Sequence, residues 1–366
     1  MQAENETTSI HVAPEWPADQ FDSPRSPLPE APYFDAHLNA WVFSRHADIL
    51  AAFRSPALFP VSLRSQRPGQ HPPEDEHQKM RAETQEALPA RRITVWRNAL
   101  LLVAEAQAGQ LAAIEPIESI DLLESYARPL CLSFAARVTG ISTDTAASLC
   151  ELARRVSAAS AEPLDPTLQP DADQADEELK KHFHSGPVLL RDSTFVALSQ
   201  TMPCLLGNAW YALIQHPEQW ALLHRQPELV ENAIEELMRY AGLVRTLTRE
   251  ASADVHLNGT HIGKGQRIVL RVITGNRDPE RFSCPNQIDI RRREGGHFAL
   301  GSGPHSCVGA SLIRMVATTL TQPLLRQFAS AKLFSPVEWQ GGSGFRSPQA
   351  LWVNLESNLK QPENKV

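Results

Sequence analysis

The sequence lacks the features that mark membrane, secreted or nucleic-acid-binding proteins. It contains no run of about 18 apolar residues, which a membrane-spanning helix needs. Its first residues, MQAENETTSIHVAPEWPADQF, hold neither a basic segment nor an apolar one, so we expect no secretory signal and a cytoplasmic location. The net charge of -7 gives no general argument for nucleic-acid binding.

Cysteines are few, and no two of them have the spacing of a metal finger or a redox pair. The chain has five, at Cys131, Cys150, Cys204, Cys284 and Cys307. An odd, dispersed set predicts free thiols in a reducing compartment. Buried cysteines usually act as small apolar side chains, and we expect this of most of them. Cys307 lies in a different setting and is treated separately.

The residues that are present predict a mainly α protein with a small β region. Apolar residues make up 42% and charged residues 21% of the 366, which is a globular composition. Helical periodicity dominates from about residue 72 to 160 and again from about 192 to 241, including a long apolar helix at about 192–215. Between them, the polar, proline-rich segment 161–179 is expected to be a loop followed by a short charged helix. A final helix is expected at about 308–328. No internal repeat is evident.

Short strands are expected in two further segments. Alternating residues with Asn-Gly and Lys-Gly turns predict antiparallel strands in 255–273, and 344–355 reads as a terminal strand pair. Residues 1–35 are rich in proline and polar groups, which favours an extended arm. We therefore expect one globular domain over 36–366, preceded by this arm.

The segment HFALGSGPHSCVGASLIRM places Cys307 in a glycine-rich turn that runs into an apolar helix. A thiolate is a good ligand for soft metals, and at a haem its electron donation favours O–O cleavage. Such a ligand needs backbone N–H groups aimed at the sulfur, which glycines make possible. The helix N-terminus adds positive potential that lowers a thiol pKa. By itself, however, the pattern fits a buried structural cysteine equally well.

Other residues in order along the chain make this pattern specific. The cysteine segment reads Leu300-Gly301-Ser302-Gly303-Pro304-His305-Ser306-Cys307-Val308-Gly309. It resembles the cytochrome P450 superfamily, specifically its soluble bacterial members, whose loop is Phe-Gly-x-Gly-x-His-x-Cys-x-Gly. The family's Glu-x-x-Arg pair matches Glu236 and Arg239, three residues apart on one helix face. Arg292 falls where a third member of that ion-pair network is expected.

The resemblance implies the cytochrome P450 fold as a single haem domain, with haem b (iron protoporphyrin IX) as the cofactor. Cys307 would ligate the iron, with Gly301 and Gly309 shaping the loop around it. Four residues would bind the haem propionates, because arginine and protonated histidine form charge-assisted hydrogen bonds to buried carboxylates: His77, Arg81, Arg249 and His305.

The distal helix departs from the family. The family's Ala/Gly-Gly-x-Asp/Glu-Thr segment, which carries the catalytic residues, falls on Ala197-Leu198-Ser199-Gln200-Thr201. Thr201 is kept, but Leu198 replaces the glycine and Gln200 replaces the acid. Glutamine has no titratable proton near neutral pH, and general acid catalysis is commonly worth about 10²–10⁴ in rate. Pro203 removes an N–H and clashes with the carbonyl of Ser199, which predicts a kink or a widened turn.

Three interpretations of this departure remain open. The chain is a reductively driven oxygenase of a small organic metabolite, with altered proton delivery that the substrate itself could complete. It is a peroxide-using or otherwise atypical haem-thiolate enzyme. Or it is a haem-binding sensor or accessory protein that has lost catalysis.

The resemblance also implies a partner. No flavin- or nicotinamide-binding segment is evident, so a separate ferredoxin or flavodoxin with its reductase would supply electrons. Arg91, Arg92 and Arg314 lie where a basic docking patch would be, or they are ordinary surface arginines. Arg245 could bind an acidic substrate or be exposed. The segment before the long helix is shorter than the family's lid, which leaves the pocket open or completed by a partner.

Overall fold

The computed structural model describes residues 29–60, 74–113, 119–163, 165 and 167–357. Most of the predicted N-terminal arm, residues 1–28, lies outside this part of the chain. Tyr33–Asp35 form the first strand, so regular structure begins inside the segment for which the sequence predicts an arm.

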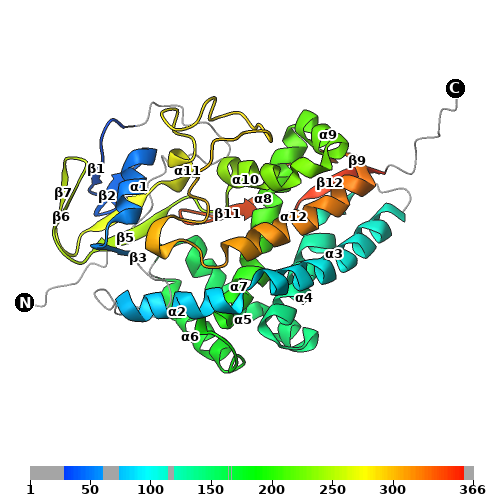
Figure 1. Ribbon diagram of the computed structural model, residues 1–366, viewed down its shortest axis with the longest axis horizontal. Coiled ribbons are helices and arrows are strands. Elements are labelled where there is room, and N and C mark those ends of the chain that lie inside the picture. The colour runs from blue at the N-terminus through cyan, green and yellow to red at the C-terminus, as the bar shows by residue number, and fades with distance from the viewer. Residues whose placement is uncertain (1–28, 61–73, 114–118, 164, 166, 358–366) are drawn as a thin grey trace, which may run out of the picture.

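Helices form most of the molecule, as the sequence predicts (Figure 1). The α-helices are α1 (His46–Arg54), α2 (Glu74–Ala87), α3 (Ala90–Ala113), α4 (Arg128–Thr139), α5 (Thr143–Ala161), α6 (Gln169–Lys180), α7 (Asp192–Val196), α8 (Met202–Gln215), α9 (Pro217–Arg225), α10 (Val230–Ala241), α11 (Val272–Gly275) and α12 (Ala310–Gln327). Two π-helical segments, η1 (Leu123–Ala127) and η3 (Ala197–Thr201), precede α4 and α8, and 3₁₀ turns are η2 (Val188–Leu190), η4 (Pro227–Leu229) and η5 (Gly303–His305).

The strands gather into four small sheets. A five-stranded sheet has the order β1 (Tyr33–Asp35), β2 (Ala40–Phe43), β8 (Arg267–Leu270), β5 (Leu247–Ala251) and β3 (Leu58–Pro60). A three-stranded sheet has the order β4 (Ile120–Asp121), β12 (Trp352–Ser357) and β9 (Phe328–Leu333). Two hairpins complete the set, β6 (Val255–Leu257) with β7 (Thr260–Ile262) and β10 (Trp339–Gly341) with β11 (Arg346–Pro348).

Two strand predictions need correction. The β6–β7 hairpin is antiparallel as expected, but β8 pairs in parallel with β2 and antiparallel with β5. The expected terminal pair is also wrong, because β11 pairs with β10 whereas β12 pairs with β4 and β9. Alternation indicates that a segment is a strand, but its partner depends on contacts that are distant in sequence.

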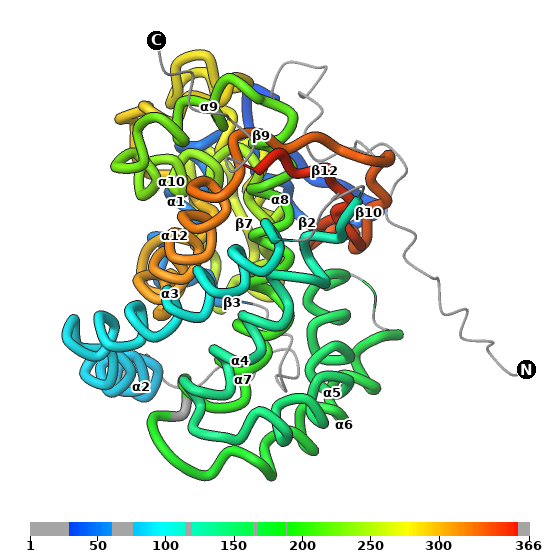
Figure 2. The backbone as a smooth tube through the Cα atoms, turned by 90° about the vertical axis from the view of Figure 1, so that its right-hand side faces the viewer, coloured from blue at the N-terminus to red at the C-terminus, as the bar shows by residue number. Residues whose placement is uncertain are grey.

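The helical core joins the segments that carry the candidate site. In Figures 1 and 2, α12 and α3 lie side by side, with α8 behind α12 and α10 above it. The fully buried Trp210 of α8 packs in this core, and its indole N–H donates to Thr321 Oγ1 of α12 at 3.0 Å. A second apolar cluster, which includes Phe43, Phe53 and Phe298, lies against the five-stranded sheet. The five-stranded sheet thus lies at one end of the molecule, whereas the other end holds most of the helices together with strands β9 and β12 (Figure 1).

Helices α5 and α6 lie side by side at the edge of the helical region (Figure 2). Ser142 caps α5, because its hydroxyl accepts the N–H of Thr145 at 3.1 Å. Gly140 takes a left-handed φ of 75° that ends α4 just before. None of the described helices combines the length and apolar character that a bilayer crossing requires.

Candidate functional site

The loop that holds Cys307 is built by tight backbone turns. Gly301 and Gly303 both have φ of 70°, a conformation that favours glycine. The Cys307 N–H donates to the Leu300 carbonyl at 2.8 Å, which closes the loop. A Cβ at Gly303 would lie 2.5 Å from the Phe53 carbonyl oxygen of α1, so only glycine allows this approach. The loop is therefore held on one side by α1 and runs on the other into α12.

The thiol of Cys307 lies in a mixed environment. Burial raises its pKa, whereas a hydrogen bond from the backbone of Gly309 and the charges of Arg81 and Arg314 act in the opposite direction. The net result in the protein alone is a raised pKa. A bound metal cation removes the thiol proton outright, so the site is suited to hold a thiolate when a metal is present.

Three of the predicted propionate ligands lie beside this loop. Arg81 of α2 donates from Nη1 to the Ser306 carbonyl at 2.6 Å, one residue before the cysteine. One turn earlier on α2, the ring of His77 lies 4.4 Å from the ring of His305. The structure thus brings His77 and Arg81, four residues apart on α2, together with His305, which lies more than 200 residues further along the chain.

Arg249 reaches the same region from the five-stranded sheet. It lies on β5 opposite Pro60 of β3, and its guanidinium stacks over Phe53 at 5.3 Å. The side chain is buried, and burial alone lowers its pKa to about 10. Its Nη1 donates to the Thr248 carbonyl, but its buried Nε finds no acceptor and no described carboxylate pairs with it. A buried arginine without an anion is costly unless a ligand supplies one.

These observations test whether the residues fit a haem. The donor set is one cysteine in a loop of left-handed glycines, with basic side chains at its edge. A haem carries two carboxylates, and the buried Nε of Arg249 is a donor that such a group would satisfy. The residues fit.

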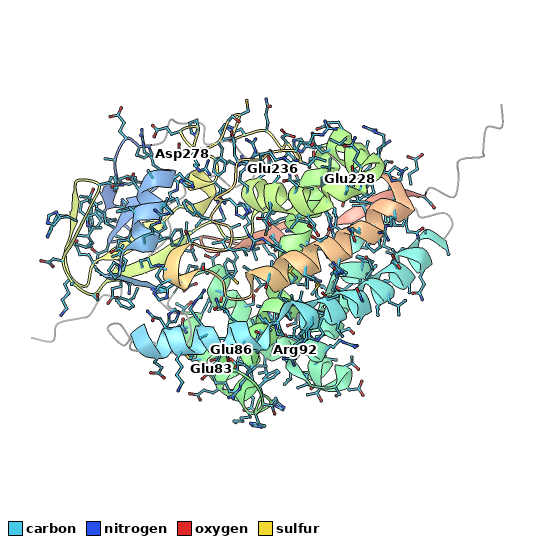
Figure 3. All side chains as sticks on the ribbon, viewed as in Figure 1. Glu83, Glu86, Arg92, Glu228, Glu236 and Asp278 are labelled. Atoms are coloured by element: carbon cyan, nitrogen blue, oxygen red, sulfur yellow. The ribbon has the colours of Figure 1, made fainter. Side chains whose placement is uncertain are left out.

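A buried ion-pair network holds the segment that precedes the cysteine loop. Arg239 makes a two-pronged contact with Glu236 on α10, with Nε–Oε2 at 2.7 Å and Nη2–Oε1 at 2.9 Å. Arg292 adds Nε–Oε2 at 3.0 Å, so the predicted third member is present. Figure 3 labels Glu236 on α10. The guanidinium of Arg239 also donates to the carbonyls of Asn276 and Pro285, which fixes the irregular segment before the cysteine loop.

The distal segment has the widened turn that Pro203 predicts. Residues Ala197–Thr201 are π-helical, and the Met202 N–H donates to the Ala197 carbonyl five residues back. Pro203 lies in the first turn of α8, where its missing N–H is tolerated. Leu198, in the glycine position, is buried in the main core. The segment is therefore distorted as expected.

Gln200 and Thr201 line a cavity of about 330 Å³. The other walls come from the end of α5, from Leu243 after α10 and from the β10–β11 hairpin. Glu162 and Cys204 also line this cavity, and neither was expected from the sequence. No local pattern marks Glu162, because it only follows α5 and precedes a proline. Ala197 does not line this cavity.

The expected basic patch is only partly present. Arg91 and Arg92 are exposed, but Glu86 of α2 lines the same surface pocket. Figure 3 shows Glu86 and Arg92 where α2 ends and α3 begins. Arg314 forms a two-pronged ion pair with Glu235, with Nε–Oε1 at 2.6 Å. Arg314 is thus a partly exposed arginine whose charge is paired with a neighbouring carboxylate, and its part in a docking patch stays a prediction.

Arg245 is buried, which excludes the exposed position. It is not among the residues that line the cavity around Gln200 and Thr201, and a role in binding an acidic substrate stays a prediction. Its Nη1 donates to the Gly342 carbonyl at 3.3 Å, and its N–H donates to Gly344 at 2.8 Å. It therefore anchors the loop of the β10–β11 hairpin.

Comparison with known proteins identifies relatives of one family. A model of the cytochrome P450 family matches residues 219–334. The chain is 30% identical to nocardicin C N-oxygenase of Nocardia uniformis over 308 residues, which cover 76% of this chain and 77% of the relative. It is 32% identical to cytochrome P450 CYP199A2 of Rhodopseudomonas palustris over 170 residues, 46% of this chain but only 41% of that relative.

Solved structures show the same fold. CYP109E1 of Bacillus megaterium in complex with testosterone has a TM-score of 0.78 at 20% identity, covering 88% of this chain and 94% of that one. P450BioI in complex with an acyl carrier protein carrying hexadec-9Z-enoic acid has a TM-score of 0.75 at 21% identity, covering 89% and 95%. At these identities the likeness establishes the fold.

Proposed function

This chain belongs to the cytochrome P450 family, and from that premise we propose that it is a haem-thiolate oxygenase of a small organic metabolite. The cofactor is haem b, with Cys307 as the iron ligand. When bound through a thiolate, haem supplies the oxygen-activating chemistry. The chain's own residues hold the group, shape the pocket and move protons.

One observation carries the proposal: the guanidinium of Arg249 is buried near the cysteine loop, and no carboxylate of the described residues pairs with it. The site needs an anion, and a haem propionate supplies it while the cysteine takes the iron. His77, Arg81 and His305 complete the set of propionate donors, as the resemblance implies. A structural cysteine in a glycine-rich turn would have no use for this arrangement of cations.

On the distal side, Gln200 and Thr201 orient water in the cavity that they line. The Thr201 hydroxyl both donates and accepts a hydrogen bond, and the Gln200 amide does the same through separate atoms. Neither releases a proton near neutral pH. Oxygenation driven by a reductant therefore requires a proton source outside the 197–201 segment.

The presence of glutamine instead of an acid at position 200 also favours a second candidate function. An enzyme that takes hydrogen peroxide as its oxidant receives both protons with it, so a missing distal acid matters less. A non-catalytic haem-binding protein would likewise tolerate the change. These alternatives share the cofactor and Cys307 and differ only in turnover.

Electrons would come from a separate ferredoxin or flavodoxin with its reductase. Arg91 and Arg92 are the exposed cations available to such an acidic partner, whereas Arg314 is engaged with Glu235. No nucleic-acid or membrane partner is proposed.

Turnover separates the candidates. Small organic compounds that shift the haem absorption are first identified from a panel that includes hexadec-9Z-enoic acid and testosterone. Product with ferredoxin, reductase and oxygen supports the proposal. Product with peroxide alone supports the second function, and absence of product with both oxidants, for compounds that bind, contradicts an enzymatic role.

A further inference from the structure

The 197–201 segment carries no carboxylate, yet oxygenation consumes protons at this site. We propose that Glu162, at the end of α5, is the proton-relay residue that replaces the missing acid at position 200. It passes protons through water in the shared cavity to Thr201. This inference rests on the proposed function and names the residue that supplies its protons.

The first observation is shared lining. Glu162, Gln200 and Thr201 all line the 330 Å³ cavity, although they come from different segments. Of the described residues that line it, Glu162 alone carries a carboxylate. A volume of this size holds several waters, because one water needs about 10–15 Å³ of such space. A water chain can therefore connect the carboxylate with the Thr201 hydroxyl.

The second observation is that the carboxylate is held in place. The Ser343 N–H donates to Glu162 Oε2 at 3.1 Å, and the Ser343 hydroxyl lies 3.4 Å from the same oxygen. Glu162 Oε1 lies directly over Gly342, where any Cβ would collide with it. A Cβ at Gly344 would lie 2.6 Å from the Ser160 carbonyl. Both glycines thus allow the hairpin loop to pack against the end of α5.

The basic residues that line the cavity are engaged with partners other than Glu162. Two other cavity residues are basic, but each has a partner: Arg154 pairs with Glu151 at 2.6 Å, and Arg346 stacks on Trp339 at 5.4 Å. On the far side of the loop, Arg245 donates to the Gly342 carbonyl. Glu162 itself is partly exposed, so it can exchange protons with solvent at one end of the cavity.

The balanced reaction defines what Glu162 must do. One substrate R–H, one O₂, two electrons and two protons give R–OH and one water. The ferredoxin or flavodoxin supplies both electrons. Glu162 gives each proton to the neighbouring water and takes its replacement from solvent, so it ends each turnover in its starting state.

Two substitutions separate a relay from a structural role. Glu162→Gln keeps an oxygen that accepts the Ser343 N–H but has no proton to give. Glu162→Asp keeps a carboxylate but shortens the reach to Ser343. A relay predicts that E162D forms product faster than E162Q. A structural role predicts the reverse order, and that order would overturn the proposal.

The magnitude is measured as product formed per electron pair, with hydrogen peroxide release recorded in parallel. The panel compound that gives the most product is used throughout. We expect E162Q to lose at least about tenfold in product, below the about 10²–10⁴ of a full general acid because water also leaks protons. Adding Gln200→Glu to E162Q should recover most of the lost product formation. A fully coupled E162Q enzyme contradicts the proposal.

The proposed function and the role of Glu162 fail in different ways. If wild type forms no product with ferredoxin, reductase and oxygen, the proposed function fails. If wild type forms product and E162Q forms it with the same coupling, the proposed function stands and only the role of Glu162 is overturned.

Discussion

At the scale of single residues, the candidate site is defined by a buried arginine and by a cysteine in a tight loop. Arg249 is buried and pairs with no carboxylate in the described part of the chain, and Cys307 lies in a loop that only left-handed glycines permit. The candidate site residues could be predicted from the sequence, because the cysteine pattern and the Glu-x-x-Arg pair are specific when they occur in order. The burial of Arg249 could not be predicted from the sequence, because it depends on contact with Phe53 and on the pairing of β5 with β3.

Arg249→Met tests the role of that guanidinium. Methionine fills the same apolar space but cannot bind a propionate, so haem should be lost faster. A charge-assisted hydrogen bond is worth about 1.5–3 kcal/mol, which corresponds to a roughly ten- to hundredfold change. The measurement is haem transfer to an excess of an acceptor protein. The control is Arg267→Met, an exposed arginine of the neighbouring strand, which should behave as wild type.

Glu236→Gln tests the buried network. The carboxylate is about 1% exposed and faces Arg239 and Arg292, so the amide leaves the buried Arg239 without its anion, whereas Arg292 keeps its ion pair with Glu294. Removing one partner from a buried ion pair costs about 3–5 kcal/mol. Urea unfolding of the loaded protein measures this loss. Glu235→Gln, one residue earlier and far more exposed, should cost much less; equal losses would contradict the account.

At the scale of elements, the helices follow from the sequence and the strand partners do not. The long helix expected at 192–215 is present as α7, η3 and α8, with the widened turn that Pro203 predicts. The final helix also lies where expected, at Ala310–Gln327. Local periodicity and proline sterics determine these features. The β8, β11 and β12 pairings join segments far apart in sequence, so alternation could not identify them.

The contact between α10 and α12 has a predictable pH dependence. Although burial alone would raise it, hydrogen bonds from His297 and Arg314 hold the pKa of Glu235 at about 2. Because this pKa is below the unfolded value, Glu235 adds stability above about pH 4.5, and this stability is lost as pH falls toward 2. The difference in unfolding free energy between wild type and Glu235→Gln should shrink over that range. A difference that is constant with pH would contradict the assignment.

At the scale of the whole molecule, the candidate site is assembled from distant segments. The cysteine loop, α2 and the five-stranded sheet bring together the residues that we propose to hold the haem. The end of α5, the π-helical segment and the β10–β11 hairpin form the distal cavity. Family resemblance predicted the first group residue by residue. It could not predict Glu162, because its place in the cavity depends on how closely Gly342 and Gly344 let the hairpin approach α5.

The central claim is that Cys307 is the thiolate ligand of a haem. The most direct test is the absorption spectrum of the reduced, carbon-monoxide-bound protein, compared between wild type and Cys307→His. We predict that wild type shows the red-shifted band of a thiolate-ligated haem, and that C307H binds haem but shows the band of a histidine ligand. A haem-loaded wild type without the thiolate band, or a C307H variant that keeps it, would contradict the account.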